Sequence, residues 1–249
     1  MTIRIFNGFT CCARFPRNWK TGLVCLLIET NQGLALVDTG LGLEDYAHPT
    51  WFTQFFRIVS YMPFNPKEAA INQLAGFGYR PEDIKHIILT HMHFDHIGGL
   101  SDFPQAKVHV YKSEYDAFIH RKGFLSAAYV PRHIAHNPDF VFYEDSGDKW
   151  FEFDAIRIPG FEPDMYFVPL PYHSVGMCGI AIKTETGWHF HCGDAAADFR
   201  RDDIPGWVMR LILGPHMPQL RKFSSEHPEI SMTASHMFLD FFEEPVNLI

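Results

Sequence analysis

The order of apolar and polar residues predicts strands and short helices in alternation. Two apolar runs, 23–30 and 33–38, meet at Asn31-Gln32-Gly33, which favours a β-hairpin. A third apolar run, 86–90, predicts a buried strand. Further strands are expected at 107–111, 140–143, 150–158, 179–182 and 230–236. Short helices are expected at 67–75, 113–120, 207–213 and 217–225. Because both patterns occur along the chain, the sequence predicts the α/β class.

The segment 43–66 follows neither pattern well. It is rich in aromatic residues, namely Tyr46, Trp51, Phe52, Phe55, Phe56, Tyr61 and Phe64. One interpretation is a helix that packs on the core. The other is a lid insertion that forms the wall of an apolar pocket, and the sequence leaves both open.

Length and composition restrict the class of protein. The 249 residues are 47% hydrophobic and show no break in composition, which favours one domain over 1–249. The chain contains no run of eighteen apolar residues, so no membrane span is predicted. The N-terminal residues lack a secretory pattern, and five cysteines, an odd number, do not suggest paired disulfides, so we expect a cytoplasmic protein.

The net charge of −8 bears on the binding partner. Proteins that bind extended nucleic acid usually carry a basic stripe, and none is visible, so a nucleic-acid partner is not expected. We expect a small-molecule substrate instead. The sequence leaves the oligomeric state open between a monomer and a homodimer.

The strongest chemical signal is Thr-His-Met-His-Phe-Asp-His-Ile-Gly-Gly-Leu at 90–100, directly after the predicted strand 86–90. It holds four potential metal ligands within six residues: His91, His93, Asp95 and His96. Imidazole nitrogen with some carboxylate oxygen is a ligand set that Zn²⁺ prefers. The first two histidines project to the same side of an extended turn and can hold one ion. The aspartate and the last histidine lie further along the bend and are better placed for a second ion.

Two later strand ends add candidate ligands. His173 lies in a tight loop between strands and fits a third ligand for the first ion. Asp194 follows Gly193 at the end of a strand, where a carboxylate can bridge two ions. The pair His189 and His191 is a rival metal site, but strand alternation turns both away from Asp194.

Three other residues outside this set receive a structural interpretation. Cys192 is expected to be a buried thiol in the strand before Asp194. His133 and His136 are expected on the surface or at the rim of a pocket, because two prolines bracket them and no carboxylate accompanies them.

Taken together, these motifs resemble those of the metallo-β-lactamase superfamily. The resemblance covers the chain from Asp38 to His236, with every motif in order, although Tyr172 and Ser174 replace the usual glycine and threonine around His173. It implies a four-layer αβ/βα sandwich with a metal site at the edge of two sheets.

The resemblance also implies a role for each site residue. It assigns the first ion to His91, His93 and His173, the second to Asp95, His96 and His236, and the bridge to Asp194. Asp38 is either a turn residue that caps its own backbone or, as in the family, an acid that orients a ligand from behind. Three residues are expected to act in catalysis: Asp95 as proton carrier, Asp38, and Tyr172 with its phenol beside the metals.

The implied reaction is hydrolysis by a hydroxide that two divalent ions share, with Zn favoured and Fe or Mn as alternatives. The substrate class is a lactone, ester or thioester of a small acyl compound, with acyl-homoserine lactones as one candidate. These lactonases usually carry a tyrosine three residues after the bridging aspartate, and here that residue is Ala197. The alternatives are a mononuclear iron sulfur dioxygenase-like enzyme and a phosphodiesterase of the same superfamily.

Overall fold

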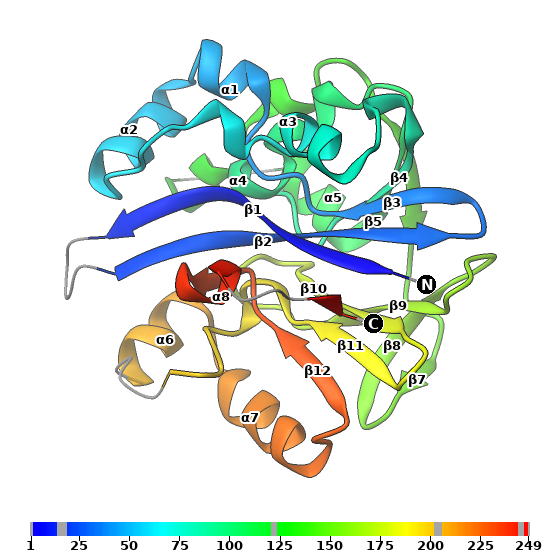
Figure 1. Cartoon of the computed structure of the whole chain (residues 1–249). Helices are drawn as coiled ribbons and strands as arrows, with labels where there is room; N and C mark the ends of the chain where they lie inside the picture. Colours follow the sequence, from blue (N-terminus) through cyan, green and yellow to red (C-terminus); the bar gives the residue numbers. More distant parts are fainter. Residues whose placement is uncertain (1, 14–18, 121–123, 202–205, 244–246, 249) are drawn as a thin grey trace.

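Two facing β-sheets with helices on their outer sides form the molecule (Figure 1). This computed structural model describes residues 2–13, 19–120, 124–201, 206–243 and 247–248. Helices α1 to α5 cover the first sheet, and α6 and α7 cover the second (Figure 1). The order of layers is therefore helix, sheet, sheet, helix, which confirms the predicted αβ/βα sandwich.

The first sheet has eight strands among the described residues, in the order β14-β1-β2-β3-β4-β5-β6, with β13 paired to β2. The strands are β1 (Ile3–Ala13), β2 (Trp19–Thr30), β3 (Gly33–Val37), β4 (Ile84–Ile88), β5 (Lys107–Tyr111), β6 (Asp139–Tyr143), β13 (His236–Phe238) and β14 (Asn247–Leu248). The predicted hairpin is β2–β3, with Leu26 opposite Val37. From β3 to β6 the strands are parallel, so the ends of β3 and β4 lie at the same edge.

The second sheet has six strands in the described part of the chain, in the order β12-β11-β10-β9-β8-β7. They are β7 (Asp148–Trp150), β8 (Phe153–Ile158), β9 (Met165–Pro169), β10 (Cys178–Lys183), β11 (Trp188–His191) and β12 (Ile230–Thr233). Neighbours from β7 to β11 are antiparallel, and β12 runs parallel to β11.

The helices are short. The α-helices are α1 (Leu43–Ala47), α2 (Trp51–Val59), α3 (Ala70–Leu74), α4 (Phe94–Ile97), α5 (Lys112–Ile119), α6 (Gly206–Ile212), α7 (Met217–Glu226) and α8 (Asp240–Glu243). The 3₁₀ turns are η1 (Pro66–Glu68), η2 (Ala75–Phe77), η3 (Pro81–Asp83), η4 (Gly98–Asp102), η5 (Phe124–Ala128), η6 (Pro131–Ile134) and η7 (Gly193–Ala195). None of the helices that the structure describes is long and apolar enough to span a membrane.

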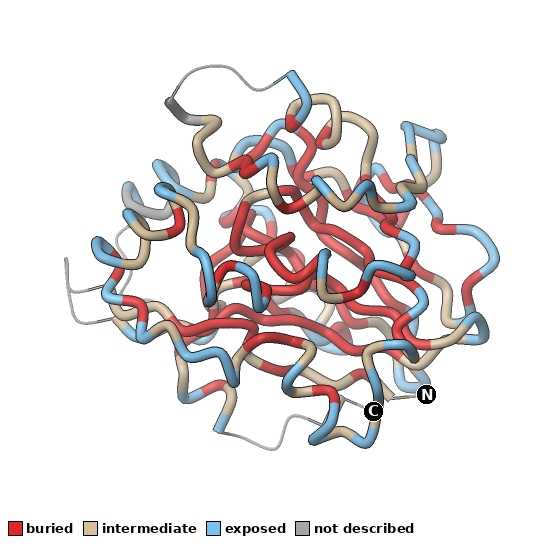
Figure 2. The backbone as a smooth tube through the Cα atoms, turned by 90° about the horizontal axis from the view of Figure 1, so that it is seen from above, coloured by how far each residue is buried: buried red, intermediate tan, exposed pale blue. Residues whose placement is uncertain are grey.

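The core explains why the strand patterns are continuously apolar. Leu26 and Ile28 of β2 belong to a buried cluster that includes residues of the second sheet, such as Phe167. The alternate residue Leu27 belongs to a second buried cluster under the helices of the upper layer. Because both faces of β2 are covered, its polar–apolar alternation is lost. The buried part of the chain forms the centre of Figure 2.

Several predicted elements are wrong in their bounds. The expected strand 150–158 is two antiparallel strands, because the chain turns back after Trp150, where Phe151 has a φ of +50°. The expected helix 67–75 is divided at Ala69, whose ψ of +133° is not helical. Helix α5 begins at Lys112 with Tyr111 as its N-cap, so Ser113 is not the cap. Strands β1 and β14 were not predicted, and β9 was expected only as a strand without bounds before His173.

The expected strand 230–236 is also wrong at its end. Strand β12 stops at Thr233 and belongs to the second sheet. His236 begins β13, which pairs with β2 of the first sheet. The histidine therefore lies where the chain passes from one sheet to the other.

The segment 43–66 forms α1 and α2. Thr50 caps α2 by accepting a hydrogen bond from the Thr53 amide, and Phe52 and Phe56 contact the ring of Phe94 in α4, with centroid distances of 5.3 and 5.1 Å. This inner face packs on the core. The outer stripe of α2 is exposed at Trp51, Phe55, Ile58 and Val59. The lid function of the segment stays a prediction.

Candidate metal centre

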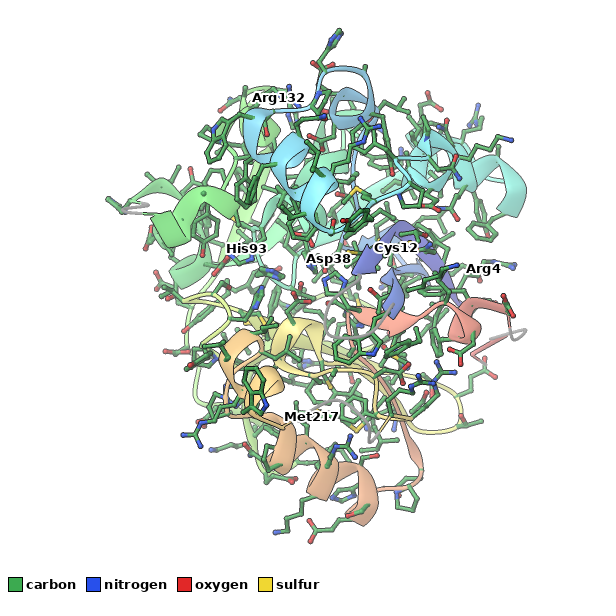
Figure 3. All side chains as sticks on the ribbon, turned by 90° about the vertical axis from the view of Figure 1, so that its left-hand side faces the viewer. Arg4, Cys12, Asp38, His93, Arg132 and Met217 are labelled. Carbon is green, nitrogen blue, oxygen red and sulfur yellow. The ribbon has the colours of Figure 1, made fainter. Side chains whose placement is uncertain are left out.

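The seven predicted ligands meet at one edge of the two sheets. The loop after β4 and the short helix α4 supply four of them, the β9–β10 loop supplies His173, and η7 supplies Asp194. Strand β13 supplies His236. Three overlapping groups have ligand atoms that all lie within 4.8 Å of one another: His91, His93 and His173; His91, His96 and Asp194; and Asp95, His96 and His236. In Figure 3, the labelled His93 and Asp38 mark this region between the upper and lower halves.

The first group consists of histidines from both sheets. His93 Nδ1 and His173 Nε2 lie 3.1 Å apart. The rings of His91 and His173 are 5.1 Å apart and nearly perpendicular. His91 is fully buried, whereas the His173 side chain is 16% exposed. The first group is therefore more accessible to solvent at His173 than at His91.

The second group lies on the other side of Asp194. Asp95 Oδ2 is 3.8 Å from His96 Nε2 and 3.6 Å from His236 Nε2. One oxygen of Asp194 is 3.6 Å from His96 Nε2, and its other oxygen is 3.1 Å from His173 Nε2. The carboxylate of Asp194 thus has one oxygen near a histidine of each group, as a bridging ligand requires.

Unpaired buried atoms show that these residues fit a metal. His91 Nε2, His96 Nε2 and Asp194 Oδ1 are buried and have no hydrogen-bond partner. Each unpaired buried polar atom costs about 1–3 kcal/mol, so native proteins rarely leave several together. Imidazole nitrogen and carboxylate oxygen are also the donors that Zn²⁺ and similar ions prefer. The donor set and the orphaned atoms both fit a bound cation.

The protonation of the site follows from burial and from the carboxylates. Burial lowers the pKa of His91 and of His93, which keeps both rings neutral and their lone pairs free. Burial also opposes charge on His96, but Asp38, Asp95 and Asp194 outweigh it and raise its pKa to about 10. A cation that binds His96 must displace that proton, so metal binding would release protons.

Asp38 orients His96. Its Oδ1 accepts a hydrogen bond from the Thr90 amide (2.9 Å), and its Oδ2 accepts one from the Thr90 hydroxyl (2.7 Å) and lies 2.7 Å from His96 Nδ1. Because a carboxylate only accepts, Nδ1 of His96 keeps its proton when the ring gives up the other one, and Nε2 is then the atom that is free to bind a cation. These partners are remote in sequence, so the alternative of a local turn cap does not describe Asp38.

Glu114 is a site residue that the sequence did not indicate. It lies in the first turn of α5 and is wholly buried. Its Oε1 accepts a hydrogen bond from the Met92 amide, and its Oε2 accepts bonds from the Ser174 hydroxyl and the Gly176 amide. A glutamate near a helix start is usually exposed, and no local pattern marks this one.

Tyr172 lies at the edge of the centre, next to His173. Its side chain is 57% exposed, and the base of its ring lies against Gly214, in the turn between α6 and α7. Its φ is +152°, an unusual value for a residue with a side chain. A role for the phenol in catalysis stays a prediction.

Of the two positions predicted for His133, the surface is wrong, while the rim of a pocket agrees with the structure, since His133 and His136 both line a cavity with Glu44 and Asp102. The ring is 3% exposed, and Nε2 lies 2.9 Å from Asp45 Oδ1. The turn η6, which begins at Pro131, directs this side chain inward, while His136 is only partly buried. Asp45 is the carboxylate partner that the sequence did not reveal, because it is 88 residues away.

The rival pair of histidines has other partners. His189 Nε2 and His191 Nδ1 lie 3.1 and 3.0 Å from the Thr233 hydroxyl of β12. Among the described residues, neither histidine belongs to a group of three ligands. Cys192 is fully buried, as predicted.

Comparison with known proteins identifies the family of the chain. A family model described as the metallo-beta-lactamase superfamily matches residues 22–186. A probable metallo-hydrolase of Mycobacterium tuberculosis is 38% identical over 177 residues, which cover 70% of this chain and 57% of that protein. An N-acyl homoserine lactonase of Bacillus thuringiensis is 30% identical over 162 residues, covering 65% of this chain and 58% of that protein. The chain thus aligns with less than two thirds of the length of these relatives.

Solved structures share the fold over nearly the whole chain. An N-acyl homoserine lactone hydrolase with N-hexanoyl-L-homoserine bound at its catalytic metal centre has a TM-score of 0.70 at 21% identity, and the match covers 98% of this chain and 96% of that one. A dizinc quorum-quenching lactonase, AidC, has a TM-score of 0.58 at 20% identity and covers 88% and 73%. On the family match and the shared fold, the chain belongs to the metallo-β-lactamase superfamily.

Proposed function

We propose that this protein is a binuclear metal-dependent hydrolase that opens a lactone, or hydrolyses a related ester or thioester, of a small acyl substrate. The observation that carries the proposal is the convergence of seven potential ligands in three overlapping groups, three of which (His91, His96 and Asp194) have buried atoms without a hydrogen-bond partner. The completeness of the second group, Asp95, His96 and His236, favours two ions over the mononuclear iron alternative. The relatives named N-acyl homoserine lactonase support the acyl substrate class.

Different residues of the site would bind the metal ions, carry protons and admit the substrate. Two bound divalent ions would lower the pKa of water from 15.7 to roughly 7 and polarise the attacked carbonyl. The seven ligands hold those ions. The Asp95 side chain is 10% exposed, so it can carry a proton between the centre and solvent. The side chains of His173 and His236 are partly exposed, at 16% and 28%, so substrate reaches the centre between them.

Two helices expose large apolar side chains. In the view of Figure 3, helix α2 is drawn above the labelled His93 and Asp38, and α6 below them. Helix α6 exposes Trp207, Leu211 and Ile212. Isolated exposed apolar residues are ordinary, but a concentration of large ones usually marks a binding surface. These residues favour an acyl substrate with an apolar portion.

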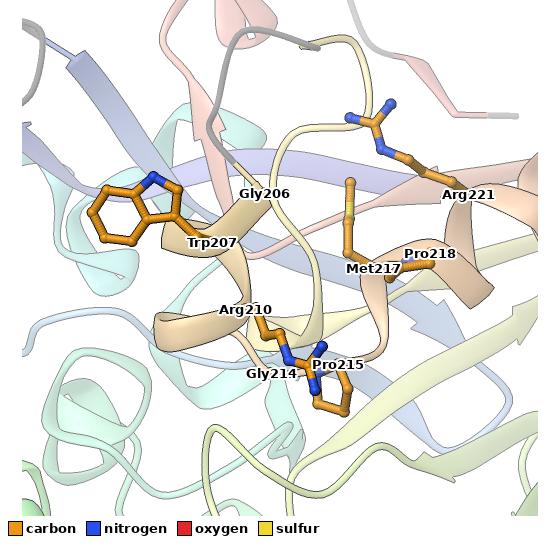
Figure 4. A pocket seen from close by; sticks show the side chains of 8 residues that line it. All are labelled: Gly206, Trp207, Arg210, Gly214, Pro215, Met217, Pro218 and Arg221. Carbon is orange, nitrogen blue, oxygen red and sulfur yellow. The ribbon is translucent and has the colours of Figure 1, made fainter.

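A cavity of about 530 Å³ lies between α6 and α7 (Figure 4). Trp207 and Met217 give it apolar walls, and Arg210 and Arg221 add positive charge. Helix α6, which forms one side of this cavity, also contacts the centre, since His173 Nδ1 lies 3.0 Å from the Ile212 carbonyl. The cavity is large enough for part of a small acyl compound.

We expect two metal ions per chain in metal-replete protein, since seven ligands are too many for one tetrahedral Zn²⁺. Elemental analysis of the purified chain, after dialysis with Zn²⁺, Mn²⁺ or Fe²⁺, measures the stoichiometry and shows which metal is retained. A single tight site would count against the binuclear proposal. One tightly bound iron ion per chain, together with consumption of oxygen, would favour the dioxygenase alternative.

We also expect a preference for neutral or weakly charged acyl compounds. At a net charge of −8 the field of the protein repels polyanions, while the apolar residues of α2 and α6 favour longer acyl chains. The measurement compares kcat/KM for acyl lactones of increasing chain length with kcat/KM for a thioester, a phosphodiester and an oligonucleotide. Faster turnover of the phosphodiester, or no gain with acyl length, would contradict the proposal.

A further inference from the structure

A buried carboxylate, Glu114, connects the two loops that supply the first group of ligands. The Met92 amide, between His91 and His93, donates to Glu114 Oε1 at 2.9 Å. On the other side, the Ser174 hydroxyl and the Gly176 amide donate to Oε2 at 2.8 and 2.9 Å. One side chain thus holds the residue between two ligands and the loop that carries the third.

The two loops belong to different halves of the molecule. The loop of Met92 follows β4 of the first sheet, whereas the loop of Ser174 joins β9 to β10 of the second sheet. A backbone hydrogen bond from Cys178 to the Thr90 carbonyl (2.9 Å) also links them, but it lies at the base of the loops. Glu114 makes its contacts next to the ligands themselves.

The close approach of the second loop to α5 requires a glycine at 176. A Cβ atom on Gly176 would lie 2.2 Å from the Glu114 amide nitrogen and 2.7 Å from its Cα. No side chain fits there, so the loop backbone rests directly on the first turn of α5. In addition, the Tyr129 ring lies 5.0 Å from the His93 ring. The carboxylate is therefore surrounded by donors from both halves.

We propose that Glu114 is a positioning residue for the first metal ion. By fixing the two loops, it sets the separation of His173 from His91 and His93, and thus the affinity of that group for metal. The second group is held differently, by Asp38 behind His96 and by β13, which carries His236. The inference rests on the metal centre of the proposed function, and it predicts an effect on one ion only.

The test is Glu114→Gln. The glutamine has the same shape, but its amide NH₂ cannot accept a hydrogen bond, so at least one donor of Met92, Ser174 or Gly176 loses its acceptor. We expect the first ion to bind roughly 10–100-fold more weakly, as is typical when groups behind metal ligands are changed. Affinity is measured by Co²⁺ titration of metal-free protein against a competing chelator. The same titration in a His236→Ala background identifies which ion has changed.

Two further variants keep the test decisive. Asp45→Asn alters another fully buried carboxylate, which bonds Arg132, His133 and the Gly42 amide but no ligand residue, and we expect it to lower Tm while Co²⁺ affinity stays unchanged. Ser174→Ala removes one donor from Glu114 and should weaken the first ion less, which gives a result even if Glu114→Gln fails to fold. Wild-type affinity for the first ion in the Glu114 and Ser174 variants, or equal weakening of both ions, would overturn the inference.

The test of Glu114 can fail or succeed independently of the test of the proposed hydrolase function. The titration needs no substrate, so a wrong substrate class leaves it unaffected. If the wild-type chain binds one ion only, the binuclear proposal fails, while the effect of Glu114→Gln on that ion still decides the role of Glu114.

Discussion

Replacing Asp194 by alanine is expected to remove most of the activity and the second metal ion while the fold survives. The carboxylate has one oxygen 3.6 Å from His96 Nε2 and the other within 3.5 Å of both His173 Nε2 and His236 Nε2. Its loss leaves each group one ligand short and removes the negative charge between them. We therefore expect a fall in kcat/KM larger than the roughly 10–100-fold typical for groups that only support a ligand.

The measurement combines kcat/KM with metal content, and circular dichroism checks the fold. Asp198→Asn is a matched control, because Asp198 is also buried but bonds Arg200 and the Phe238 amide, outside the ligand set. We expect that variant to keep two ions. An Asp194→Ala protein with both ions and near-normal turnover would exclude a bridging role.

Replacing Asp38 by asparagine is expected to reduce metal affinity and activity by roughly 10–100-fold. The new side chain can still accept a hydrogen bond from Thr90, but its NH₂ group would face His96 Nδ1. The His96 proton then moves to Nε2, the atom that must bind metal, so the ring is held in the wrong tautomer. Asparagine also tolerates the backbone here, where φ is +54°, better than alanine does, so the change isolates the side-chain effect.

Zn²⁺ affinity and kcat/KM measured together test this role. We expect a decrease in both that excess Zn²⁺ partly reverses, since the ligand atoms themselves remain. Asp198→Asn again serves as the control. Unchanged affinity and activity in the Asp38 variant would mean that its bonds to Thr90 and His96 serve only the fold.

The ligands of the first motif could be predicted because they are close in sequence. His91, His93, Asp95 and His96 follow a buried strand, and a strand end with this ligand density has little other purpose. His173 and Asp194 were also predictable, since each lies at the end of its own strand, where the sheets present residues to one edge. His236 was assigned by resemblance, and its assumed place at the tip of β12 was wrong.

The local sequence did not predict the contacts between residues that are far apart in the chain. Glu114 reaches Met92 across 22 residues and Gly176 across 62, and His133 reaches Asp45 across 88. A glutamate in a first helical turn, or a histidine between prolines, has the same local pattern whether it is buried or exposed. Its environment depends on which other segment packs against it, and that is a property of the fold.

The sequence by itself determined the α/β class, the β2–β3 hairpin and the cluster of four candidate ligands at 91–96, because hydrophobic periodicity and clustered donors are local properties. The tertiary structure alone decided the passage of the chain from β12 to β13, the exposed outer stripe of α2 and the burial of Glu114 between two loops. These features arise where the two sheets and their helix layers meet, and the free energy of such contacts depends on partners that no local window contains.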